Sequence, residues 1–217
     1  IGKTTSKISD DYFIESSDVN YFRSLNLMTS EKRAYITDSL ENRYTVENYK
    51  FEILDKILKG KNLTHSDLIG DKYNLSEGMI NFTTNELIGK DLLVAFNKNK
   101  YDNPIQDPRL KGNVAYSNQK DTKVSKGVYT TCKISEDKCP PWMMKATSIE
   151  HDKKKKQIKY KNAWLKVYDV PIVYFPIFFH PDPSVVRQSG FLKPVWSNSD
   201  TLGRSLYTPY FHVIAKD

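Results

Sequence analysis

Two cysteines and four histidines are the residues of this 217-residue chain best suited to form a covalent cross-link or hold a metal ion. Cys132 and Cys139 enclose a six-residue polar loop just before Pro140 and Pro141. A closely spaced, even pair usually forms a disulfide in an exported protein, whereas in a cytosolic protein it more often binds metal or does redox work. Two thiolates are too few for a zinc site without nearby histidines, and the histidines here are widely separated. We therefore predict a local Cys132–Cys139 disulfide and no metal site.

Arrangements typical of catalysis are missing from the sequence. It contains no Gly-x-Ser-x-Gly elbow, no His-Glu-x-x-His helix, no glycine-rich phosphate cradle and no cysteine placed beside a base. His180 and Asp182 have the spacing of a base and its orienting acid, but both flank prolines in a stretch that reads as a linker. We therefore expect no catalytic residue, no cofactor and a function other than an enzyme's.

Strand-forming residues dominate the composition, with 14 Tyr, 10 Phe and 3 Trp against only four Met. The longest apolar run, from Val170 to Phe179, is too short for a transmembrane helix and contains Pro171 and Pro176. The length suits one domain, or one domain and the start of another. Because the chain begins at Ile1 without a signal-like segment, we expect a mature or trimmed sequence.

The formal net charge is +7, from 33 Lys and Arg against 26 Asp and Glu. A moderate basic excess fits nucleic acid, an anionic membrane or an acidic ligand, so it is a weak signal alone. No recognition helix, RNP-type motif or zinc knuckle accompanies it, and we expect no nucleic-acid partner. The run from Lys153 to Lys156 is interpreted as a solvated hairpin turn.

A repeat of 29 residues runs through the first hundred positions. Tyr44, Val46, Phe51 and Leu58 recur as Tyr73, Leu75, Ile80 and Leu87, and Gly60-Lys61-Asn62-Leu63 recurs as Gly89-Lys90-Asp91-Leu92. A less regular copy begins at Tyr12. Within a unit, short alternating strands are separated by the polar pair Glu47-Asn48, which switches the inward face. Such a period is typical of stacked units that bury one continuous apolar interior.

The positions expected to point into that interior form an apolar strip. They are Val46, Phe51, Ile53, Leu75, Ile80, Phe82, Leu92, Val94 and Phe96. Closed tightly, the strip is an ordinary core, and left partly open, it is a trough. Lys59, Lys61, Lys90 and Lys126 are expected along its rim, either as anion-pairing groups or as solvated surface lysines.

The second half of the chain continues the strand pattern. An insertion-like loop from Asn97 to Lys111 precedes strands at 127–132 and 143–149, and a hairpin pairs 148–151 with 157–164. Prolines at 171, 176, 194 and 209 lie in or beside apolar β-like runs. Since proline has no N–H for a β-ladder, these runs predict weakly paired seams. The predicted fold class is all-β.

Several irregular motifs resemble the LPS-assembly protein family, known as LptD or OstA, where its periplasmic domain meets its membrane barrel. These are Asn162-Ala163, the Val170 to Pro176 block, His180-Pro181-Asp182-Pro183, the Arg187 to Pro194 block and Pro209-Tyr210-Phe211. The match continues upstream through the Gly127 to Cys132 block and Ile149-Glu150-His151-Asp152. The SGFLKP block following the VPIVYFP block is the most specific part.

The resemblance implies an OstA-type β-jellyroll of stacked β-repeats over residues 1–179. Residues 180–217 would then be a linker and the first strands of a truncated outer-membrane β-barrel. It further implies that the apolar strip holds the acyl chains of lipopolysaccharide. Pro194 and Pro209 would weaken the strand pairing of a lateral gate through which lipid leaves the barrel.

The same resemblance implies partners and a location. The partners are lipopolysaccharide, a periplasmic bridge protein of the LptA type, a plug lipoprotein of the LptE type, and the outer membrane. This portion would lie in the periplasm at the cell outer membrane. In the family a cysteine at the Cys132 position bonds to one at the far end of the barrel, and the additional Cys139 favours the local pairing instead.

Two other functions stay open at this point. A free-standing periplasmic lipid carrier of the same repeat fold would explain the strip but does not need the SGFLKP and TPYF segments. A carbohydrate-active or other β-sandwich enzyme predicts paired carboxylates about 5 to 10 Å apart on a concave face.

Overall fold

The computed structural model describes residues 4–9, 12–38, 41–66, 70–97, 107–133, 140–182, 185, 189–192, 195–199 and 203–214. These residues are all-β apart from one 3₁₀ turn, η1 (Arg23–Leu25). The strands are β1 (Thr4–Ser9), β2 (Tyr12–Ser16), β3 (Asn20–Phe22), β4 (Leu27–Ser30), β5 (Ala34–Asp38), β6 (Arg43–Glu52), β7 (Ile57–Ser66), β8 (Lys72–Asn81), β9 (Glu86–Ala95), β10 (Arg109–Ser117), β11 (Asp121–Thr130), β12 (Trp142–Asp152), β13 (Gln157–Val167), β14 (Val170–Pro181), β15 (Gly190–Phe191), β16 (Val195–Ser199), β17 (Gly203–Tyr207) and β18 (Tyr210–Phe211).

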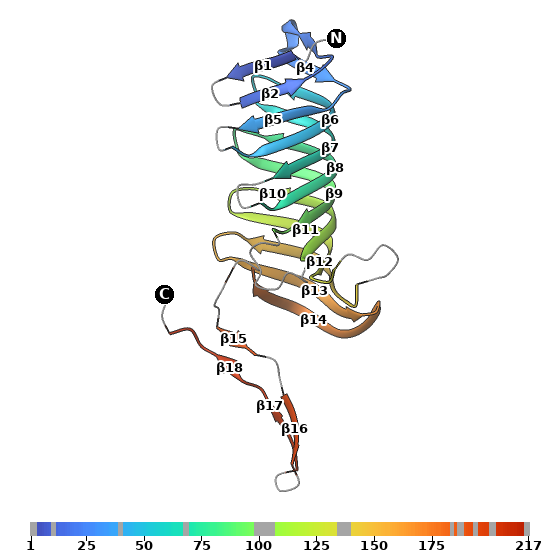
Figure 1. The fold of residues 1–217 in the computed structure, drawn as a ribbon, viewed down its shortest axis with the longest axis vertical. Coiled ribbons are helices and arrows are strands. Elements are labelled where there is room, and N and C mark those ends of the chain that lie inside the picture. The colour runs from blue at the N-terminus through green and yellow to red at the C-terminus, as the bar shows by residue number, and fades with distance from the viewer. Residues whose placement is uncertain are drawn as a thin grey trace.

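Within the described residues, one antiparallel sheet of fourteen strands contains β1 to β14 in nearly sequential order. Successive strands lie beside one another, so the sheet rises as a stack with β1 at one end and β14 at the other (Figure 1). The expected all-β fold is confirmed. Among these residues, no helix has the length and apolar character needed to span a bilayer.

Each long strand of the stack bends once near its middle. In β6, Tyr44 and Val46 are buried before the bend and Tyr49 and Phe51 after it, so the inward positions skip a residue. The alternation of inward and outward side chains shifts at Asn48, whose φ of 49° lies in the left-handed region. Asn62, Asp91, Lys126 and Asn162 do the same in β7, β9, β11 and β13. The extra residue keeps both halves of a strand facing one interior.

Glycines line the inner corner of this bend. Gly60 pairs with Gly78, and Gly78 pairs with Gly89, in three neighbouring strands. A Cβ at Gly60 would lie 2.3 Å from Cγ2 of Val46, and one at Gly89 would lie 2.8 Å from the carbonyl oxygen of Glu77. The repeated Gly-Lys-Asn/Asp-Leu motif therefore forms the corner. Its glycine lies on the inside of the bend and its lysine on the outside, its Asn or Asp has a left-handed backbone conformation, and its leucine lies in the core.

In the first part of the sheet, the bend is replaced by a break between two separate strands. The first half of β6 pairs with β5 and its second half pairs with β4. β4 and β5 thus act together as one bent strand interrupted at residues 31–33. The less regular repeat copy that begins at Tyr12 corresponds to β2 and β3, which are separated in the same way.

The bends bring the two ends of the strands together across one apolar core. Phe82, in the turn after β8, lies 5.4 Å from Tyr44 at the start of β6 and 4.8 Å from Tyr12, measured between ring centroids. Near the other end of the stack, Tyr129 at the end of β11 lies 5.2 Å from His180 in β14. The core cluster runs without interruption from Ile14 to Ala163. We call the two facing rows of strand ends the lips of the sheet.

The large sheet ends at Pro181, two residues beyond the predicted domain boundary. After it, β15 pairs with β18 and β16 pairs with β17, which gives two small two-stranded sheets (Figure 1). The β15–β18 pair joins Gly190 to Phe211 and Phe191 to Tyr210. The two motifs SGFLKP and TPYF, far apart in sequence, are thus neighbours.

Candidate functional site

The residues predicted to point inward all do so. Val46, Phe51, Leu75, Ile80, Phe82, Leu92, Val94 and Phe96 are at most 7% exposed, and Ile53 packs partly buried against them. They form a closed core with the neighbouring strands, so no open apolar trough runs through the described residues. The bends fold each strand upon itself, and large side chains such as Tyr49, Tyr160 and Phe51 fill the space between the two halves. Lipid contact by these nine residues stays a prediction.

A cleft of 370 Å³ lies where the lips meet. One side comes from the ends of β6, β7 and β8, where the rings of Tyr44 and His65 stack 4.6 Å apart and His65 and Tyr73 stack 5.4 Å apart. The other side comes from the opposite strand ends, including Ile80 and Leu87. The cleft therefore has an aromatic and aliphatic floor that leads into the core.

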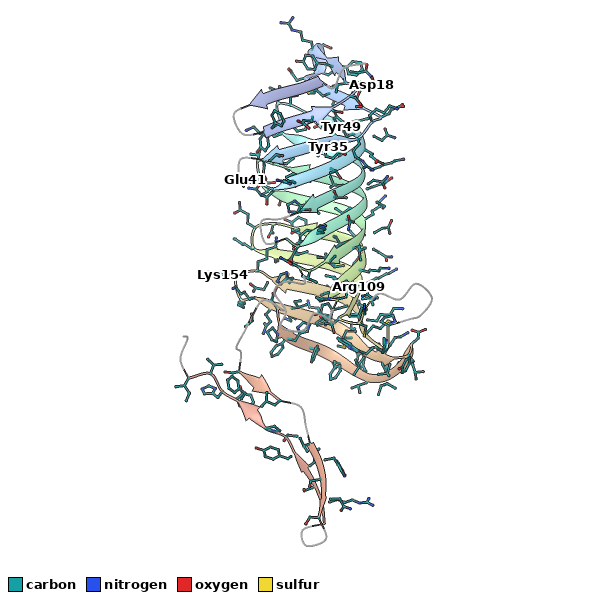
Figure 2. All side chains as sticks on the ribbon, in the orientation of Figure 1. Asp18, Tyr35, Glu41, Tyr49, Arg109 and Lys154 are labelled. Carbon is teal, nitrogen blue, oxygen red and sulfur yellow. The ribbon has the colours of Figure 1, made fainter. Side chains whose placement is uncertain are left out.

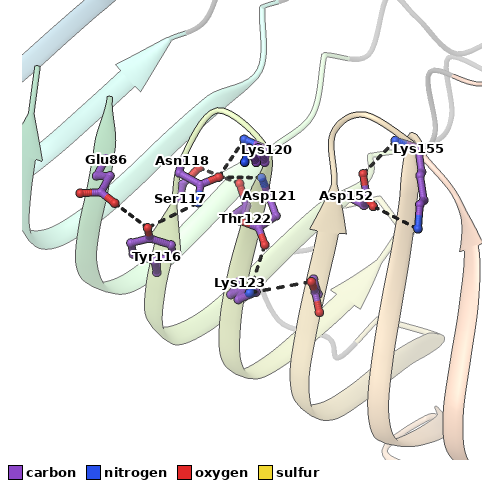
Figure 3. Close-up of polar contacts among 11 residues, drawn as sticks. Glu86, Tyr116, Ser117, Asn118, Lys120, Asp121, Thr122, Lys123, Asp152 and Lys155 are labelled. Carbon is purple, nitrogen blue, oxygen red and sulfur yellow. Dashed lines mark hydrogen bonds and ion pairs between the residues drawn. The ribbon is translucent and has the colours of Figure 1, made fainter. Parts of the chain in front are cut away.

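Polar groups hold the turns on one lip of this cleft (Figure 3). The Tyr116 hydroxyl donates to Glu86 Oε1 at 2.6 Å, and this bond, with one from Thr84, holds the pKa of Glu86 below its usual range. Asn118 Oδ1 accepts the backbone N–H groups of Lys120 and Asp121 at 2.7 and 2.8 Å, which closes the turn between β10 and β11.

Lys153 joins two neighbouring turns of that lip. Its Nζ donates to the Asn118 carbonyl at 2.6 Å and to Ser117 Oγ at 3.0 Å. Lys153 and Lys156 line the cleft together with His151 and Asp182. Part of the Lys153 to Lys156 run, expected to be a solvated turn, is thus a structural link between hairpins, whereas Lys154 projects from the turn (Figure 2).

His180 and Asp182, which have the sequence spacing of a base and its orienting acid, have different partners in the structure. Asp182 binds His151, with Oδ2 2.5 Å from Nε2, and does not orient His180. His180 Nδ1 instead donates to the Pro181 carbonyl oxygen at 2.6 Å, and the Tyr160 hydroxyl lies 2.7 Å from Nε2 and donates to it when the ring is neutral. Burial lowers the pKa of His180, so the neutral ring is favoured. These contacts hold β14, the last strand of the large sheet, to the lips.

The lysines expected along the rim lie elsewhere. Lys59, Lys61 and Lys90 line a shallow groove of 480 Å³ on the outer face, over the glycine corner. Lys59 pairs with Glu52 at 2.8 Å and Lys90 with Glu77 at 3.2 Å. Lys126 occupies the left-handed position of β11 and is exposed. Alternation places them outside because their neighbours point inward.

The disulfide prediction is not supported. Cys132 is a free thiol whose Sγ lies 3.7 Å from the Trp142 carbonyl oxygen. Cys139 lies outside the described residues. Among the described residues, no group of three or more His, Cys, Asp and Glu is placed to hold a metal ion.

One of the two gate prolines can be placed. Pro209 lies beside the β15–β18 pair, and its carbonyl accepts the Leu192 N–H at 2.9 Å. Pro194 lies outside the described residues. The role of both prolines in a gate stays a prediction.

Comparisons with known proteins agree with these motifs. No family model matches the chain. Over 114 residues, 51% of this chain, it is 30% identical to the LPS-assembly protein LptD of Pseudomonas fluorescens, and it covers 12% of that protein. It is 35% identical over 94 residues to the protein of the same name from Shewanella denitrificans, and it covers 12% of that length too. The Pseudomonas aeruginosa protein is 29% identical over 114 residues.

The chain spans about an eighth of the length of these relatives, and the match covers about half of the chain. Through that half, it belongs to the LPS-assembly protein LptD family as a distant homologue.

Proposed function

We propose that this chain takes part in the transport and assembly of lipopolysaccharide at the outer membrane. The observation that carries the proposal is a single apolar interior, continuous from Ile14 to Ala163, that reaches the surface at the cleft between the lips. The family match supports it, because the relatives are named LPS-assembly proteins. The function is transport, and no bond of the lipid has to be made or broken.

Acyl chains enter this interior by parting the lips. Burying one methylene is worth about 0.8 kcal/mol, so a single chain of about a dozen methylenes gains about 10 kcal/mol. The contacts that close the lips at one point are the Phe82 pairs with Tyr44 and Tyr12 and the bond of 3.4 Å from the Tyr12 hydroxyl to the Phe82 carbonyl. Aromatic pairs are worth about 0.5–1.5 kcal/mol each beyond their buried area. Relative to an acyl chain in water, this gain exceeds the loss of the contacts around Phe82.

The ends of the stack suit handover to other components. Among the described strands, β1 pairs only with β2, so its other edge would offer backbone groups to a bridge protein of the LptA type by strand addition. At the other end, the chain leaves β14 toward the segments of Pro194 and Pro209, the proposed lateral gate. We also propose the plug lipoprotein as a partner and the periplasm as the location, on the basis of the family match.

Photo-crosslinking tests the proposal. A photoreactive residue at Phe51 or Phe82 in the purified chain, irradiated with lipopolysaccharide, is expected to give lipid adducts. The matched control positions are Lys50 and Thr83, which are adjacent in sequence but exposed on the surface. Adducts at Phe51 and Phe82 and not at the controls support a lipid route through the interior. Equal labelling at all four positions, or adducts to protein side chains alone, would refute it.

A further inference from the structure

The outer face of the last hairpin, β13–β14, carries an exposed apolar strip. Trp164, Tyr174, Ile177 and Phe179 are 42%, 43%, 61% and 59% exposed. We call these four residues the outer strip. They share the outer face because their neighbours Tyr160, Ala163 and Phe178 face the core and successive strand residues alternate. The rings of Trp164 and Tyr174 lie 5.1 Å apart, and the Tyr174 hydroxyl donates to Asn162 Oδ1 at 2.9 Å.

Over the last four strands of the sheet, the apolar character of the rows of Ile177 and Phe179 is confined to β14, although Val114 on β10 is also exposed in the row of Ile177. The two outer rows that end at Phe179 and Ile177 carry Lys123 and Ser125 on β11, then Glu150 and Ser148 on β12. An internal strand of the same sheet thus keeps a solvated outer face, as expected of a sheet in water. On β14 the same rows become aliphatic and aromatic. Large exposed apolar side chains grouped in this way mark an interaction surface.

Lysines lie beside the outer strip on β12 and β13. Lys159 and Lys161 lie directly opposite Phe179 and Ile177, and Lys145 lies opposite Trp164. In the described residues, Lys159 and Lys161 have no acidic partner within ion-pair distance. Residues 145–182 contain eight lysines and four acidic residues, so they hold four of the seven net positive charges of the chain. The surface is therefore complementary to a partner that is apolar within and anionic at its boundary.

We propose that the outer strip lies against the headgroup region of an anionic bilayer. Trp and Tyr favour this depth because their rings are apolar and their polar groups reach water, and lysines beside them extend their amines to the phosphates. Ile177 and Phe179 then enter the acyl boundary, where each buried methylene adds to the binding free energy.

A protein strand added to the edge of β14 fits the same observations less well. Pro171, Pro176 and Pro181 leave three residues of this edge strand without an N–H. An added strand would be held by backbone hydrogen bonds, and it would leave the outer strip exposed to water on its face. The bilayer accounts for both the aromatic residues and the lysines.

Vesicle binding by the whole 217-residue chain tests the proposal. The probe is a vesicle of equal parts phosphatidylglycerol and phosphatidylcholine, and the variant is Ile177→Ser with Phe179→Ser. Because both side chains are more than half exposed, the variant should keep the thermal unfolding midpoint of the parent. Binding should weaken by about tenfold or more, since each side chain loses part of its transfer free energy. Added salt should weaken binding of the parent chain as well.

The control variant addresses other exposed apolar residues. Trp196 and Leu206 are 67% and 57% exposed in the β16–β17 pair, and Trp196→Ser with Leu206→Ser removes a similar amount of apolar surface there. Binding lost in this variant and kept in Ile177→Ser with Phe179→Ser would overturn the proposal. So would equal binding by all three chains, or equal binding to vesicles of phosphatidylcholine alone.

Lipids brominated in the acyl chains give a second readout. They should quench tryptophan fluorescence in the parent chain and in Trp196→Phe, but much less in Trp164→Phe. Quenching that survives Trp164→Phe would place the contact elsewhere. The outcome does not depend on lipid passing through the interior, so failure here leaves the crosslinking test at Phe51 and Phe82 unaffected.

Discussion

Replacing Gly60 with alanine tests whether the inner corner of the bend sets the fold. The new Cβ would lie 2.3 Å from Cγ2 of Val46, 3.0 Å from the Glu47 carbonyl oxygen and 3.2 Å from the Cβ of Tyr49. Val46 is fully buried, so it has no room to turn away without disturbing the core. Overpacking of this kind costs about 1–3 kcal/mol, against a gain of about 0.4–1 kcal/mol from the less flexible unfolded chain. A net loss of about 1–2 kcal/mol is expected.

A double-mutant cycle identifies the cause. Val46→Ala alone should cost about 2 kcal/mol, because two buried methyl groups are lost and a cavity forms. In the Gly60→Ala, Val46→Ala double variant, the new methyl group enters that cavity, so the total should fall short of the sum by about 1 kcal/mol or more. Equilibrium urea unfolding measures all four chains, and the slope of the unfolding curve should stay constant.

Gly190 provides the matched control. A Cβ there has nothing within 4 Å, so Gly190→Ala should leave the free energy of unfolding within about 0.5 kcal/mol of the parent. If Gly60→Ala behaves like Gly190→Ala, or if the Gly60 and Val46 changes are simply additive, the corner does not depend on close packing and the reasoning is wrong.

Three further changes follow from the core and the lips. Phe82→Ala should cost about 3–5 kcal/mol in urea unfolding, because it removes a buried ring that joins the lips; an effect below about 1 kcal/mol would mean that the lips close without it. Tyr160→Phe should cost about 0.5–1.5 kcal/mol through loss of the 2.7 Å bond to His180, and an unchanged urea midpoint would contradict that bond. Because burial lowers the pKa of His180, the folded state binds fewer protons than the unfolded state, so stability should fall as the pH drops below about 6.5. His180→Gln should flatten that fall between pH 7 and 5, and a profile of unchanged steepness would refute the assignment.

The sequence predicts the bend well because the repeat encodes it locally. The switch of inward face at Glu47-Asn48 coincides with the left-handed conformation of Asn48, and Gly60-Lys61-Asn62-Leu63 repeats the same geometry in β7. Asparagine, aspartate and glycine signal such positions by themselves. The hairpin of Ser148 to His151 with residues 157–164 is likewise confirmed, with Ser148 opposite Lys161.

What the sequence does not predict depends on distances across the folded sheet. The partner of Asp182 is His151, 31 positions away, because the end of β14 lies beside the turn between β12 and β13. The closure of the lips depends on Phe82 meeting Tyr44 from another strand end, and alternation alone does not reveal that contact. The expected position of the lysines along the rim is wrong for the same reason. The sequence shows that Lys59 and Lys90 point outward, but it does not show that the bend lies opposite the lips.

The bend also determines how such a closed sheet can open. Neighbouring strands are held by backbone hydrogen bonds on both sides of the bend, as in the pairing of β8 with β9 over Lys72 to Asn74 and again over Glu77 to Asn81, and these bonds run between strands. Under the proposed function, parting the lips would rotate the two halves of the strands about the bend, where β6, β7, β9, β11 and β13 carry left-handed residues. The lips could therefore separate while the ladders stay intact, and the main loss would be side-chain packing, which the acyl chains of the proposed route would replace. The closed core and the proposed lipid route through the same residues would then be two positions of one hinge.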